Sequence, residues 1–132
     1  MSINPQDYAP NEAWLLFWLN DAPVHTVSDG DFNVMAIMDV GTGLILGMEF
    51  VGILAEEPTE FESRKLLASA ESKAGERPQR LLVDSGQNLS QLIERASAMG
   101  LEVILESGSN LNPITQEARE GFAAHVSGAR KQ

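Results

Sequence analysis

The sequence of 132 residues contains no cysteine, which excludes both a disulfide framework and a thiolate metal site. It has no apolar run near the roughly 18 residues that a membrane-spanning helix requires. The opening residues, MSINPQDYAP, lack the basic and apolar regions of a secretory signal peptide. These absences predict a cytoplasmic protein.

Basic residues are also scarce, because nine Lys and Arg stand against nineteen Asp and Glu, giving a net charge of −10. No basic run is longer than the pairs Arg64-Lys65 and Arg130-Lys131. Proteins bind nucleic acid mainly by neutralising phosphates with Lys and Arg, and an acidic surface repels polyanions. The charge therefore favours a protein partner or self-association over nucleic acid.

The clearest pattern in the chain spans residues 80–106 and predicts a strand, a helix and a second strand. The short aliphatic run Leu81–Val83 ends at Asp84, and Asn88 can cap the helix that follows. Residues 101–105 form the next strand, which must lie parallel to the first through a right-handed crossover. Asp84 then lies at a carboxyl end of the sheet, where open α/β folds place their ligands.

Periodicity and turn residues predict the remaining elements. These are a strand over 13–19, a hairpin over 32–54 that turns at 41–43, a helix over 59–75, and a last helix over 112–128. The last helix is expected to be capped by Asn112, with Pro113 in its first position. We expect a loose N-terminal arm over 1–11, a single domain over 12–127 and a tail over 128–132.

The resulting order, β-β-β-α-β-α-β-α, resembles the ribonuclease H-like fold and in particular the catalytic cores of integrases and transposases. The residues that carry the likeness are AIMDVGTGLILG at 36–47, RPQRLLVDSG at 77–86, and Asp21 after the first strand. The resemblance implies a five-stranded mixed α/β sheet in the order 3-2-1-4-5, with helices packed on it. The layout also resembles small bacterial domains of unknown function, of which this chain would be a degenerate relative.

The resemblance implies a chemistry in which three carboxylates hold two divalent metal ions for phosphodiester transfer. Asp21 would be the first carboxylate, Asp84 the second, and Glu117 or Glu120 the third, with Mg²⁺ or Mn²⁺ as the metal. Asp21 and Asp84 alone could hold one Mg²⁺, which keeps most of its waters.

Helix geometry tests the third carboxylate, because a metal ligand must point toward the sheet. At 100° per residue, Glu120 lies opposite the apolar stripe of the last helix and Glu117 lies on its flank. Neither glutamate points toward the sheet as the resemblance requires. This departure from the family pattern favours a non-catalytic descendant of the fold, a binding or assembly module that needs no cofactor. A metal-dependent nuclease or polynucleotidyl transferase stays open as the alternative.

Each candidate residue also has a simpler interpretation. Asp21, Asp39 and Asp84 are typical turn acceptors after strands. Glu117 and Glu120 fit a solvated helix face, and the two histidines, His25 and His125, cannot form a typical zinc site by themselves.

The second hairpin strand, Leu44–Leu54, has the sequence LILGMEFVGIL and would leave an apolar sheet edge. Exposed edge strands of this kind pair with other chains unless they are covered. We therefore expect this edge to form a homodimer or to be covered by the N-terminal arm or another segment.

Overall fold

A computed structural model describes residues 4–20, 31–52, 58–85 and 89–130 of the chain. The elements are η1 (Pro5–Asp7), β1 (Ala13–Trp18), β2 (Phe32–Asp39), β3 (Ile45–Gly52), α1 (Glu60–Ala74), β4 (Arg80–Asp84), α2 (Ser90–Ala98), β5 (Glu102–Glu106) and α3 (Gly108–Arg130). Among these residues, no helix is both long and apolar enough to cross a membrane.

The five strands form one sheet in the order β3-β2-β1-β4-β5, as predicted. β1 and β2 pair antiparallel, as do β2 and β3, whereas β4 lies parallel to both β1 and β5. The run of apolar residues at 13–19 is thus the central strand and not a helix. Its side chains are buried on both faces of the sheet, which explains why it is apolar without a break.

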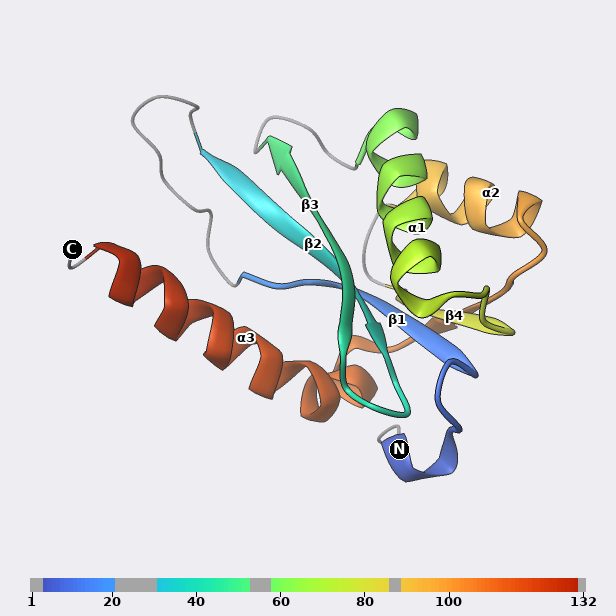
Figure 1. The fold of residues 1–132 in the computed structure, drawn as a ribbon, viewed down its shortest axis with the longest axis horizontal. Helices are drawn as coiled ribbons and strands as arrows, with labels where there is room; N and C mark the ends of the chain where they lie inside the picture. Colours follow the sequence, from blue (N-terminus) through green and yellow to red (C-terminus); the bar gives the residue numbers. More distant parts are fainter. Residues whose placement is uncertain (1–3, 21–30, 53–57, 86–88, 131–132) are drawn as a thin grey trace.

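The sheet separates two apolar cores, with α1 and α2 on one face and α3 on the other (Figure 1). Side chains alternate along β1, so Trp14 and Leu16 face α1 and α2 while Leu15 and Phe17 face α3. The first helix is capped as predicted, since Thr59 and Glu62 form a complete capping box.

Two predicted helix starts differ from the structure. α2 has Leu89 at its N-cap with no side-chain cap bond, and Asn88 lies outside the described residues. α3 begins at Gly108, not after Asn112, because the Ser107 hydroxyl accepts a bond from the Ser109 N–H at 3.2 Å and so caps the helix.

Residues 108–111, which precede the predicted start of the last helix, therefore form the first turn of α3. Pro113 lies one turn inside the helix, where its ring nitrogen cannot donate to the carbonyl four residues back. The helix also continues past Gly128 to Arg130, into the segment predicted as a tail.

Residues 4–11, which the sequence led us to describe as a loose arm, are held against the domain in several places. The Trp14 indole donates to the Asn11 side chain at 2.6 Å, and the Asn11 amide donates to the Glu76 carbonyl at 3.2 Å. Tyr8 packs against the α3-side core. The domain boundaries at residues 11 and 127 stay predictions.

Candidate functional site

The carboxyl end of β4 places Asp84 between two neighbours on the α3 face of the sheet. On one side, Asp84 is aligned with Glu106 of β5. On the other side it lies beside Phe17 of β1, because the β1–β4 register pairs Leu16 with Val83, one residue earlier on each strand. Alternation along the strands directs all three side chains toward α3. Two carboxylates and one aromatic ring therefore meet at this end.

The β1 side of this end is closed by an aromatic ring and a cation. Phe17 is only 2% exposed. The Arg119 guanidinium of α3 lies 5.9 Å from the centre of the Phe17 ring, and its Nε donates to the Trp18 carbonyl at 2.9 Å. In the strand position beside Asp84, the chain has an apolar side chain covered by a positive charge.

Asp84 itself packs against the start of α3. A Cβ added to Gly108 would lie 2.9 Å from one carboxylate oxygen of Asp84, so only glycine leaves room for the side chain as it stands. Gly108 is the first residue of α3, and the positive end of the helix dipole favours a carboxylate there. Glu106 is held in turn by the Asn110 amide at 3.3 Å.

Glu117 and Glu120, the other acidic candidates within the described residues, do not gather around Asp84. Glu117 lies over the β2–β3 hairpin, on the far side of β1 from β4, and Glu120 is exposed and accepts a bond from Gln116 at 3.0 Å. Asp21 lies outside the described residues, as do His25 and the side chain of His125. Within the part of the chain that the structure describes, no three His, Asp or Glu side chains are grouped to hold a metal ion.

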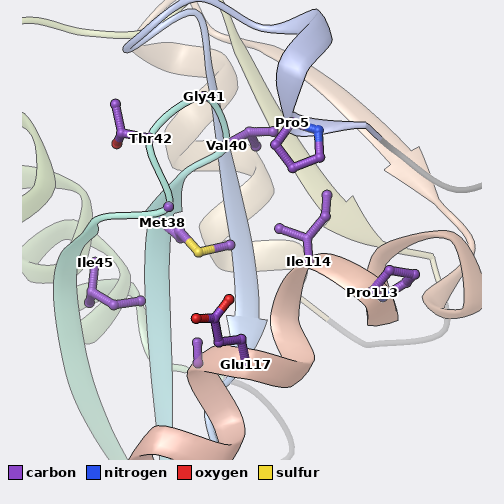
Figure 2. Close-up of a pocket in the computed structure, with 11 residues that line it drawn as sticks. Pro5, Met38, Val40, Gly41, Thr42, Ile45, Pro113, Ile114 and Glu117 are labelled. Carbon is purple, nitrogen blue, oxygen red and sulfur yellow. The ribbon is translucent and has the colours of Figure 1, made fainter.

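A pocket of about 480 Å³ lies where η1, the β2–β3 turn and α3 meet. Figure 2 shows its lining, with Met38 and Ile45 from the hairpin and Ile114 from α3 around an open space. The Glu117 carboxylate points from α3 into that space (Figure 2). Helix periodicity predicted Glu117 on the flank of its helix, and the structure places it there. Nothing in the sequence indicated that this flank faces the β2–β3 hairpin.

Asp39 organises the wall of this pocket. It is 5% exposed, and its carboxylate accepts bonds from the Asn11 N–H at 3.0 Å, the Gly41 N–H at 3.3 Å and the Thr42 hydroxyl at 2.8 Å. The prediction that Asp39 is a turn acceptor is confirmed. Its bond to Asn11, 28 residues earlier, was not foreseen and ties the N-terminal segment to the turn.

No protein-family model matches the chain, and no curated protein matches its sequence. Solved structures do resemble it. The integrase catalytic core domain of HTLV-2 matches with a TM-score of 0.51 and 14% identity, over 76% of this chain and 64% of that one. The simian T-cell lymphotropic virus intasome, in complex with PP2A regulatory subunit B56 gamma, matches with a TM-score of 0.55 and 14% identity, over 87% of this chain and 38% of that one.

The chain thus spans less than two thirds of the length of either integrase chain. At 14% identity the likeness concerns the fold, which agrees with the observed strand order and helix placement. This protein has a ribonuclease H-like fold, built as in the catalytic cores of retroviral integrases.

Proposed function

We propose that this chain is a non-catalytic binding or assembly module on a ribonuclease H-like fold. The observation that carries the proposal is the pairing of Phe17 with Arg119 beside Asp84. Two-metal phosphoryl transfer needs carboxylates around both ions. A buried ring in that position, covered by a guanidinium, supplies no ligand to either ion.

The net charge supports the same proposal. A nuclease must bring a polyanionic substrate to its strand ends, and a chain of net charge −10 opposes this approach. A neutral protein partner carries no such penalty, and a basic partner surface is attracted.

Self-association through β3 is the form of assembly that the structure supports best. β3 is an edge strand and, within the described residues, pairs only with β2. Met48 and Phe50 on its α3 side are 51% and 58% exposed. Its single charged residue, Glu49, is paired with Lys65 at 3.3 Å, so the edge is locally neutral. A second copy would add an antiparallel strand where repulsion between the acidic chains is weakest.

A metal-dependent nuclease is the second candidate, with Asp21, Asp84 and Glu117 or Glu120 as its carboxylates. The specific observation in its favour is that Asp84 occupies a carboxyl strand end under α3. The similar HTLV-2 core is described as a magnesium complex in a dimeric form.

A cleavage assay separates the two candidates. We expect no cleavage of single- or double-stranded DNA or RNA by the purified chain with Mg²⁺ or Mn²⁺, and no difference between the wild-type chain and Asp84→Asn. Cleavage that is lost in Asp84→Asn would establish the nuclease instead. Cleavage that persists in Asp84→Asn would indicate a contaminating enzyme. Further purification should then remove the activity.

Light scattering after size exclusion tests the assembly. We expect a dimer for the wild-type chain and a monomer for Phe50→Lys, because a charge at the exposed edge prevents strand pairing. Phe61→Lys is the matched control, since Phe61 is 57% exposed but lies on α1. A wild-type chain that stays monomeric at high concentration would contradict pairing through β3.

A further inference from the structure

The pocket between the β2–β3 hairpin and α3 combines an apolar floor with one charge. Met38 and Val40 are almost fully buried at its base, and Ile45 and Ile114 are half-buried at its sides. Among the described residues that line it, Glu117 is the only charged one. A pocket of about 480 Å³ with an apolar floor and a carboxylate at its side has the size of a ligand site.

Glu117 differs from the other acidic side chains around it. Glu120 accepts a bond from Gln116, Glu106 from Asn110 and Glu49 from Lys65. Glu117 makes neither a hydrogen bond nor an ion pair with any residue in the described ranges. Glu117 is exposed, and its carboxylate points over the apolar floor of the pocket with no cation among the described lining residues, which leaves a favourable position for a positive group (Figure 2).

The wall opposite α3 is held firmly in place. The Asp39 carboxylate holds the turn through Gly41 and Thr42. Gly41 approaches the N-terminal segment so closely that an added Cβ would lie 2.7 Å from the Ala9 carbonyl oxygen. A wall that is already ordered loses little conformational freedom when a ligand enters.

We propose that this pocket takes an arginine side chain presented by a protein partner. The aliphatic part of the side chain would pack along Met38 and Ile114, and the guanidinium would meet Glu117 in a charge-assisted contact. Arginine suits the site better than lysine, because its planar group matches a carboxylate and is more weakly hydrated. The net charge of −10 attracts such a partner.

This inference rests on the proposed binding function and names the chemistry of the partner. The two can fail separately. The cleavage assay concerns Asp84 on β4, whereas the pocket lies over β2 and β3 and does not include that residue.

The test is a titration of the ¹⁵N-labelled chain, followed by the amide resonances of Thr42, Gly43 and Ala118. The probes are the blocked peptide acetyl-Gly-Arg-Gly-amide and the same peptide with citrulline, which has the shape of arginine without its charge. We expect saturable shifts with the arginine peptide at millimolar concentrations and at least about tenfold weaker binding of the citrulline peptide.

Glu117→Gln should weaken binding of the arginine peptide by about tenfold. Glu120→Gln, three residues further along and on the outer face of α3, should leave the affinity unchanged. The proposal is overturned by the absence of shifts up to about 50 mM peptide, by equal binding of the citrulline peptide, or by unchanged binding in Glu117→Gln. It is also overturned if butylguanidinium binds and the blocked peptide does not, since the pocket would then take a small organic cation.

Discussion

The two ends of the α3 face place their acidic residues in different surroundings. At the carboxyl end of β4, Asp84 is enclosed by Phe17, Glu106 and the start of α3. Across the sheet, Asp39 is enclosed by the hydrogen bonds of a turn, while Glu117 faces an open pocket without a partner in the described residues.

The difference shows that a strand end becomes a reactive site only through what the neighbouring elements bring to it. Asp84 lies at the carboxyl end of its strand, but α3 brings Arg119 to the ring beside it. Glu117 is an ordinary exposed residue in the sequence of its helix, but α3 places it over the pocket beside the β2–β3 hairpin. α3 therefore determines the surroundings of both Asp84 and Glu117.

The largest effect should come from removing the ring beside Asp84. Phe17→Ala should lower the free energy of unfolding by about 3–5 kcal/mol, because the ring is almost fully buried and a cavity would remain under Arg119. Urea unfolding followed by circular dichroism measures this. Phe61→Ala, at an exposed site on α1, is the control and should change stability by less than about 1 kcal/mol. If Phe17→Ala lowered the free energy of unfolding as little as the control does, the Phe17 ring would not contribute to the stability of this end of the sheet.

Much of the fold could be predicted because its signals are local. The Thr59–Glu62 capping box, the aliphatic run at 81–83 and the glycine turn at 41–43 each lie within a few residues. The handedness of crossovers then restricts the strand order. The start of α3 was missed because the Ser107-Gly108-Ser109 sequence is typical of a loop, and Pro113 suited a first helical position.

Asp39 supplies the next test, at the pocket end. Asp39→Ala should lower the free energy of unfolding by about 2–3 kcal/mol, because two backbone N–H groups and one hydroxyl lose their acceptor in a mostly buried site. The same urea titration measures it, with Asp7→Ala, an exposed acidic residue in η1, as the control. If the two variants lost equal stability, the wall of the pocket would not depend on the Asp39 bonds.

The candidate site was harder to predict than the fold because its decisive contacts join distant parts of the chain. Arg119 donates to a carbonyl 101 residues earlier, and Asp39 accepts from an N–H 28 residues earlier. Helix periodicity correctly placed Glu117 on a flank and Glu120 on the outer face, but it gives no information on the hairpin opposite. The part played by Asp21 stays a prediction.

The smallest effect concerns the contact between Asp84 and Gly108. Gly108→Ala places a methyl group 2.9 Å from an Asp84 carboxylate oxygen, so the carboxylate must move. Alanine also favours a helical backbone by about 0.5–1 kcal/mol, which offsets the clash. We expect a net loss of stability of about 0.5 kcal/mol.

A double-mutant cycle isolates this contact from the helix propensity. In an Asp84→Ala background the clash is absent, so Gly108→Ala should stabilise the chain, and the two changes should couple by about 1–1.5 kcal/mol. Gly121→Ala is the control, because an added Cβ there meets nothing within 4 Å, and its effect should be the same with or without Asp84. A coupling near zero for Gly108 would mean that the Asp84 side chain moves freely. The carboxylate would then be as available to a ligand as Glu117 is at the other end, and the contrast between the two ends would disappear.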